Sequence, residues 1–223
     1  MVDLPSSPLA EVDLEFEKMA LETGGFTFTK LPSTTMREKL MQCVAHDICL
    51  ANVGLAYKMH IMALTMHGTA YADILALIRF VAPYSGYPAA ATALGALARY
   101  AKELGIETAA DADPGIDTSG GRDACWPVGD DWIAEFLASR MGRAWSEGRL
   151  SERERAFAAL AAHVTQQALG PSFRRHVELA LEVAPPEEVR AAVRFTSEFG
   201  VARAAAALEE LEKVLADVSP GSA

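Results

Sequence analysis

Aromatic and basic residues are both scarce in this sequence. Aromatic residues make up 8% of the 223 residues, whereas alanine is abundant. Alanine has the highest helix propensity of all residues, so this composition favours an all-α fold. The 20 lysines and arginines are outnumbered by 30 aspartates and glutamates, which gives a formal net charge of −10. An acidic chain without a basic stripe argues against nucleic acid or an anionic membrane as a partner.

Thiols and long apolar runs are also few. The three cysteines, Cys43, Cys49 and Cys125, are an odd number, which argues against a disulfide framework and favours a reducing, cytoplasmic location. No uncharged apolar run reaches the length of about 18 residues that a membrane span needs. The first residues include an early acid and lack an apolar core, so we expect no secretory signal.

Hydrophobic residues, 51% of the chain, recur with helical spacing along most of its length. The predicted helices of the first half span residues 8–23, 35–51, 54–66, 71–82 and 89–104. We expect Gly24 and Gly25 to end the first helix, and a turn or kink over 83–88 to follow the fourth. Residues 106–128 are rich in Gly, Pro, Asp and Ser, which predicts a solvated linker.

The pattern of the first half recurs after this linker. Arg37-Glu38-Lys39 corresponds to Arg153-Glu154-Arg155, and Tyr57-Lys58-Met59-His60 corresponds to Phe173-Arg174-Arg175-His176. The spacing from glutamate to histidine is the same in both copies. We therefore interpret the chain as two divergent helical repeats, at 1–105 and 129–223, joined by the linker at 106–128. Docking the repeats face to face would bury the apolar surface that neither can bury alone.

Several of these segments resemble one known family. The run WSEGRLSERER at 145–155 is similar to the start of the core unit of carboxymuconolactone decarboxylases and their AhpD-like relatives. In the first half, KMHIMAL at 58–64 and APYSGYPAA at 82–90 are similar to the histidine helix of the family and its tyrosine-glycine-proline turn. The resemblance implies an AhpD-like fold of short packed helices in two tandem units. It also implies a homo-oligomer, with a trimer favoured.

The redox motif of the AhpD-type members is absent. That motif reads Cys-x-x-Cys-x-x-x-His, and its cysteine positions are held here by Val53 and Ala56 before His60, and by Leu169 and Ser172 before His176. A peroxidase of that type needs both thiols, so this activity is disfavoured.

His60 is the strongest candidate for catalysis. A histidine on a buried helix can donate or accept a proton near neutral pH, although it can also be a core residue bonded to a carbonyl. His46 and Asp47 form a polar pair in an otherwise apolar helix, which is costly to bury without partners. The predicted catalytic residues are therefore His60, His46 and Asp47, in a pocket built mainly by the first repeat. His176 is the equivalent of His60 in the second repeat.

Four further residues are predicted to bind substrate. Lys58 precedes His60 by one half-turn and would hold an anionic oxygen, unless it belongs to a solvated stripe. Tyr57 adjoins it, and Tyr84 and Tyr87 flank a Ser-Gly turn, where they could present phenols or serve as packing anchors. The histidines lack the spacing of common zinc motifs, so we expect neither a metal nor another cofactor.

The predicted function is that of a carboxymuconolactone decarboxylase-like enzyme, a lyase or an isomerase. It would perform acid/base chemistry without a cofactor on a small carboxylated, lactone or polyketide-like substrate. Two alternatives remain open at this stage. One is a natural-product tailoring enzyme, a cyclase or an oxygenase, on the same fold. The other is a non-catalytic oligomeric helical binding module.

Overall fold

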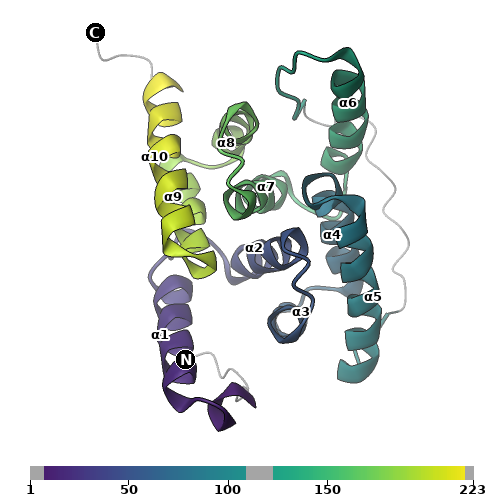
Figure 1. Ribbon diagram of the computed structural model, residues 1–223, viewed down its shortest axis with the longest axis vertical. Coiled ribbons are helices and arrows are strands. Elements are labelled where there is room, and N and C mark those ends of the chain that lie inside the picture. Colours follow the sequence, from purple (N-terminus) through teal and green to yellow (C-terminus); the bar gives the residue numbers. More distant parts are fainter. Residues whose placement is uncertain (1–7, 109–122, 219–223) are drawn as a thin grey trace.

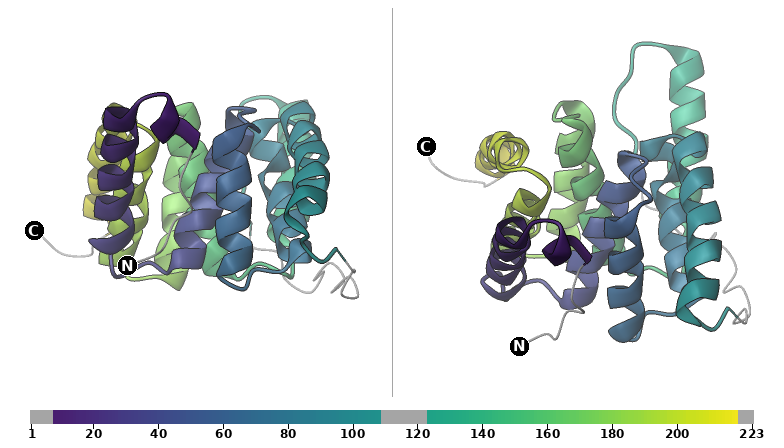
Figure 2. Two further views of the ribbon diagram at one scale, coloured as in Figure 1. Left: turned by 90° about the horizontal axis from the view of Figure 1, so that it is seen from below. Right: turned by 60° about the horizontal axis from the view of Figure 1, so that its bottom comes forward.

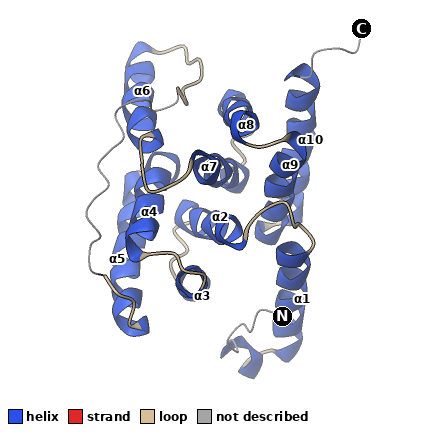
Figure 3. Ribbon diagram, turned by 180° about the vertical axis from the view of Figure 1, so that it is seen from behind, coloured by secondary structure: helices blue, strands red, loops and turns tan. Residues whose placement is uncertain are grey.

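The computed structural model describes residues 8–108 and 123–218, and every regular element in these ranges is helical (Figure 3). The elements are η1 (Pro8–Glu11), α1 (Leu14–Thr29), α2 (Met36–Cys49), α3 (Leu55–Met66), α4 (Tyr71–Ser85), α5 (Tyr87–Leu104), α6 (Asp131–Trp145), α7 (Glu152–Gln166), α8 (Pro171–Val183), α9 (Pro186–Phe195), η2 (Thr196–Phe199) and α10 (Val201–Val218). The predicted all-α fold is confirmed. Within the described ranges, no helix combines the length and the apolar character needed to cross a membrane.

Helices α2 and α7 begin with the same local device, a capping box. The Thr35 hydroxyl accepts from the Glu38 N–H, and the Glu38 carboxylate accepts from the Thr35 N–H at 2.7 Å. Ser151 and Glu154 repeat this exchange at the start of α7. Each box satisfies two backbone donors that a helix start otherwise leaves unpaired. These two helices therefore begin where their own sequences specify.

Two helices extend beyond their predicted ends. Gly24 and Gly25 lie inside α1, because two glycines lower helix propensity by only about 1 kcal/mol each and leave the backbone bonds intact. Pro83 lies inside the last turn of α4, which ends three residues later than expected, and the chain turns at Gly86, within the predicted stretch 83–88. The φ angle of Gly86 is +85°, a left-handed conformation that favours glycine.

Helices α2 and α7 lie side by side at the centre of the molecule (Figure 1). Helix α3 packs against α2 and α8 packs against α7. Helices α4, α5 and α6 cover one flank of this centre, and α1, α9 and α10 cover the other (Figures 1 and 2). Five buried alanines of α7 provide small side chains in this crowded centre: Ala156, Ala158, Ala159, Ala161 and Ala162.

Reciprocal ion pairs join α2 to α7. Arg37 Nε lies 2.6 Å from Glu154 Oε1, and Arg153 Nε lies 2.5 Å from Glu38 Oε1. The two arginines hold equivalent positions in the predicted repeats, and so do the two glutamates. Each glutamate therefore serves its own capping box and the arginine of the opposite helix. These reciprocal ion pairs support the interpretation of the chain as two repeats, which stays a prediction.

The first helix of each half packs against the other half. The ring of Phe28 in α1 meets the edge of Phe195 in α9, with centroids 5.0 Å apart. The indole of Trp145 in α6 meets Phe80 in α4 at 5.6 Å. The core is therefore continuous across the predicted repeats, and α1 belongs in space with the second half.

Part of the predicted linker is packed. Residues 109–122 lie outside the described ranges, but the described stretch 123–128 contacts α7 and α8. Ala124 is fully buried, Arg175 donates to the Asp123 carbonyl, and the Trp126 ring lies 5.9 Å from that of His176. The expectation of a solvated segment is therefore wrong for this stretch, because the indole finds an aromatic environment there.

Candidate active site

The predicted catalytic residues Asp47 and His60 contact each other. Asp47 lies on α2 and His60 on the neighbouring α3, and the Asp47 Oδ2 atom lies 2.6 Å from the His60 Nδ1 atom. The Asp47 side chain is 2% exposed, whereas the His60 side chain is 25% exposed. A buried carboxylate thus orients an imidazole that solvent can reach. Asp47 engages Nδ1, which leaves Nε2 as the ring nitrogen that is not bonded to Asp47.

The surroundings of His60 favour its protonated form. Burial by itself lowers the pKa of His60, but Cys43 and Asp47 outweigh it and raise the pKa well above the ordinary value. Cys43 lies one turn before Asp47 on α2 and is fully buried, and burial raises the pKa of its thiol. The raised pKa of His60 therefore reflects both of its partners on α2, the Cys43 thiol and the Asp47 carboxylate.

His46 lies in the same region, but its surroundings lower its pKa instead of raising it. Its Nδ1 atom lies 3.0 Å from the Thr165 hydroxyl, and its ring stacks on Phe199 with centroids 4.2 Å apart. Burial, followed by the positive charges of Arg203 and His60, lowers the pKa of His46 to about 4. The surroundings therefore favour the protonated form of His60 and the neutral form of His46. Such opposed tendencies are typical of an acid and base pair.

Residues of α1 and of η2 complete this region, and the sequence pattern did not point to them. The Thr27 hydroxyl of α1 donates to the Glu198 carboxylate of η2 at 2.6 Å. Phe199, next to Glu198, supplies the ring against His46. No local spacing could have revealed these residues, because α1 and η2 meet α2 only in the folded chain. The candidate catalytic residues come from the first half, but their environment comes from both halves.

Three of the predicted substrate-binding residues lie in other surroundings. Lys58 forms an ion pair with Glu103 at 2.7 Å, on a different face of α3 from His60. The Tyr57 hydroxyl is buried and donates to the carbonyl of Ala93. Tyr87 is half exposed at the start of α5. The contacts of Lys58 and Tyr57 are those of residues that tie α3 to α5.

The fourth, Tyr84, belongs to a second polar cluster. The Trp145 indole N–H donates to the Tyr84 hydroxyl at 2.8 Å, and this hydroxyl lies 2.8 Å from His176 Nε2. An indole can only donate, so the phenol proton is available for His176. His176 Nδ1 then carries a proton, and it faces the Ser172 carbonyl at 2.7 Å and His163 Nε2 at 3.0 Å. Each side chain of this hydrogen-bonded series, from Trp145 through Tyr84 and His176 to His163, therefore has a partner within it.

Burial favours the neutral form of both histidines of this cluster. It lowers the pKa of His176 to about 4 and that of His163 well below the ordinary value. His163 and His176 hold the positions that Asp47 and His60 hold in the first predicted repeat. The same two positions thus carry a partly exposed Asp–His pair in one half and a buried His–His pair in the other. The geometry of the second pair is that of a structural network linking α4, α6, α7 and α8.

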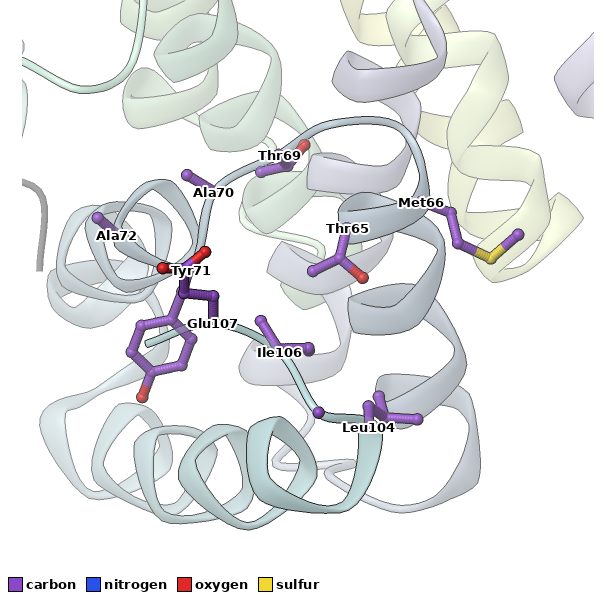
Figure 4. Close-up of a pocket in the computed structure, with 10 residues that line it drawn as sticks. Thr65, Met66, Thr69, Ala70, Tyr71, Ala72, Leu104, Ile106 and Glu107 are labelled. Carbon is purple, nitrogen blue, oxygen red and sulfur yellow. The ribbon is translucent and has the colours of Figure 1, made fainter. Parts of the chain in front are cut away.

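A surface depression of about 520 Å³ lies elsewhere, where the end of α3, the start of α4 and the end of α5 meet (Figure 4). Its lining residues are Thr65, Met66, Thr69, Ala70, Tyr71, Ala72, Leu104, Gly105, Ile106 and Glu107. None of them is a predicted site residue. Among the residues that the structure describes, no three His, Cys, Asp or Glu side chains are placed to hold a metal ion.

A comparison of the chain with protein-family models finds no matching family, and a comparison with curated proteins finds no match. The resemblance to carboxymuconolactone decarboxylases therefore stays a prediction that rests on the segments quoted above.

Proposed function

We propose that this protein is a cytoplasmic, carboxymuconolactone decarboxylase-like enzyme that transfers protons on a small carboxylated, lactone or polyketide-like substrate without a cofactor. The observation that carries the proposal is the Asp47–His60 contact, in which a buried carboxylate holds a partly exposed imidazole at 2.6 Å. This arrangement suits general acid catalysis, because the carboxylate fixes the ring and stabilises its charged form.

A protonated His60 favours decarboxylation over reactions that begin with removal of a proton. The bond between the carboxylate carbon and the α carbon breaks, and its electron pair becomes an enolate while carbon dioxide leaves. His60 then donates its Nε2 proton to the α carbon and regains one from water. The imidazolium also stabilises the negative charge as it develops.

His46 extends the proposal to isomerisation. Its pKa of about 4 leaves it neutral at pH 7, so it can accept a proton from carbon while His60 donates one at a second position. The Thr165 hydroxyl and the Phe199 ring hold His46 in place for this role. We place decarboxylation first because it needs only the better-oriented residue, His60.

The test is turnover of a substrate panel in D₂O, followed by NMR. The panel comprises β-keto acids and carboxylated γ-lactones, and the signal is loss of carbon dioxide with incorporation of deuterium at the α carbon. We expect His60→Gln to lower kcat by about 100-fold or more, since general acid catalysis contributes roughly that factor. His67→Gln is the matched control, because His67 is exposed at the end of α3. Full turnover by His60→Gln would refute the assignment.

The pH profile tests the role of Asp47. Activity that requires protonated His60 falls as the pH rises through the raised pKa of this residue. Asp47→Asn removes the stabilising charge, so the fall moves to a lower pH. An unchanged profile in this variant contradicts the role given to Asp47. Ligand binding by the parent protein without turnover of any compound would favour the non-catalytic binding module.

A further inference from the structure

Helix α1 and the turn before it expose an unusual number of large apolar side chains. Val12 is 84% exposed, Phe16 54%, Met19 66% and Phe26 61%. A contiguous exposed apolar surface on a soluble protein commonly marks an interaction site. Figures 1 and 2 show α1 at the edge of the molecule.

These side chains follow the spacing of a coiled-coil seam. The positions are Val12, Phe16, Met19, Thr23, Phe26 and Lys30, which alternate by four and three residues. This alternation is the a/d pattern of a heptad repeat, and it places the residues from Phe16 to Phe26 in one stripe along α1, with Val12 just before the start of the helix and Lys30 at its end. The rest of α1 already has partners, since Thr27 at the border of the seam bonds Glu198 and Phe28 on the far face packs on Phe195. The seam is therefore additional to the contacts that hold α1 in the fold.

We propose that this seam pairs with the same seam of a second copy of the chain, with the two α1 helices antiparallel. An antiparallel pair brings each a position opposite a d position. Centring the pair on residue 21 places Phe16 opposite Phe26 of the second copy and Met19 opposite Thr23 of the second copy. Every position of the seam then has a partner, as a two-fold interface requires.

Charge also favours the antiparallel orientation. Lys30, whose ammonium lies 4.6 Å from the centroid of the Phe26 ring, would meet the start of α1 in the second copy. That end carries the exposed acids Glu11 and Asp13. A parallel pair would instead bring the two Lys30 side chains together, which is unfavourable.

The exposed area is sufficient for a stable contact. A fully buried aromatic side chain removes roughly 150–250 Å² from water, so each half-exposed side chain of the seam still offers about 100 Å². The four large apolar residues together offer about 400 Å² per copy. A standard interface buries about 800 Å² per partner, of which somewhat more than half is apolar. The seam therefore supplies most of the apolar area that a standard dimer interface contains.

Helix α6 offers a smaller exposed apolar surface, which makes it the natural control. Trp132, Ile133 and Phe136 are exposed there, but they occupy only the first turns, and Glu135 interrupts the stripe. A contact between α1 and α6 of another copy would be head-to-tail and would build a ring, such as the trimer that the family resemblance implies. The two arrangements predict different responses to mutation.

Light scattering on the full-length protein distinguishes them. We expect the parent protein to be a dimer, with twice the chain mass of 23.9 kDa. The double variant Phe16→Glu/Phe26→Glu should be a monomer whose helical circular dichroism spectrum matches that of the parent. The control Trp132→Glu/Phe136→Glu should remain a dimer. The proposal is overturned by a monomeric or trimeric parent, by a dimer that survives the α1 substitutions, or by dissociation of the α6 variant.

Cross-linking tests the orientation and register independently. In the double variant Met19→Cys/Thr23→Cys, the two new thiols of opposite copies face each other, so mild oxidation should give a covalent dimer. The parent, which retains Cys43, Cys49 and Cys125, controls for its native thiols. A dimer in which the new thiols do not cross-link more than the parent would rule out the antiparallel register.

Discussion

The buried cluster around Tyr84 provides the sharpest test of the structural argument. Tyr84→Phe removes one oxygen and leaves the packing of the ring unchanged. That oxygen accepts from the Trp145 indole and bonds His176 Nε2, both at 2.8 Å. Tyr84 is partly buried, and this burial raises the pKa of its hydroxyl far above the ordinary value. The substitution therefore isolates the contribution of two hydrogen bonds to buried residues, Trp145 and His176.

The expected loss follows from the groups left behind. Trp145 and His176 would each keep a buried polar nitrogen without this partner, and each unsatisfied group costs roughly 1–3 kcal/mol. The His176 Nδ1 bond to Ser172 remains, so the imidazole stays neutral and in place. We expect the free energy of unfolding to fall by about 3 kcal/mol. That is a large share of the 5–15 kcal/mol typical of a folded protein.

Urea unfolding, followed by circular dichroism at pH 7, measures this loss. Tyr87→Phe is the matched control, since Tyr87 is half exposed and we expect a change within about 0.5 kcal/mol. If Tyr84→Phe also changes the unfolding free energy by less than this, the cluster does not stabilise the fold as argued. A stabilised variant would contradict the proton directions assigned to the network.

Three further predictions concern pH, backbone conformation and thiol reactivity. His176 and His46 have pKa values of about 4 in the folded state against about 6.5 unfolded, so the unfolded chain binds more protons between these values. The stability that these histidines contribute is present above pH 6.5 and is lost as the pH falls toward 4. We expect the free energy of unfolding from urea titrations to be lower at about pH 5 than at about pH 7, by roughly 2 kcal/mol for each residue. Equal urea midpoints at the two pH values would contradict this. Gly86→Ala forces a side chain into a left-handed conformation and should lower the free energy of unfolding by about 1–2 kcal/mol. The control is Gly95→Ala in the middle of α5, for which we expect no comparable loss. Cys43 should react with a thiol reagent only on unfolding, whereas the partly exposed Cys125 reacts in the native protein; rapid native labelling of Cys43 would show that its environment opens.

Prediction from sequence succeeded where short-range signals decide the structure. The helix expected over 35–51 is α2, because Thr35 and Glu38 form a capping box that defines its start. The helix expected over 54–66 is α3, which begins directly after Gly54. Prediction failed at Gly24, Gly25 and Pro83, because local propensity is weak and packing overrides it.

The candidate site, like the fold, could be predicted from the sequence only in part. His46, Asp47 and His60 were selectable from sequence, because polar side chains on apolar helices need partners when buried. Their distances, and the opposite pKa tendencies of the two histidines, depend on how α2, α3 and η2 pack. Tyr84 was assigned to substrate binding, whereas the structure places it beside His176.

The amino-acid sequence alone determined the all-helical fold, the boundaries of the capped helices and the set of polar side chains that burial would force into contact. Only the tertiary structure decided which partner each of them has. It paired Asp47 with His60 near the surface and enclosed His176 with Tyr84 and Trp145. The physical reason is range: capping and periodicity act within a few residues, whereas hydrogen bonding and solvent exposure depend on helices that are distant in the chain and adjacent only after folding.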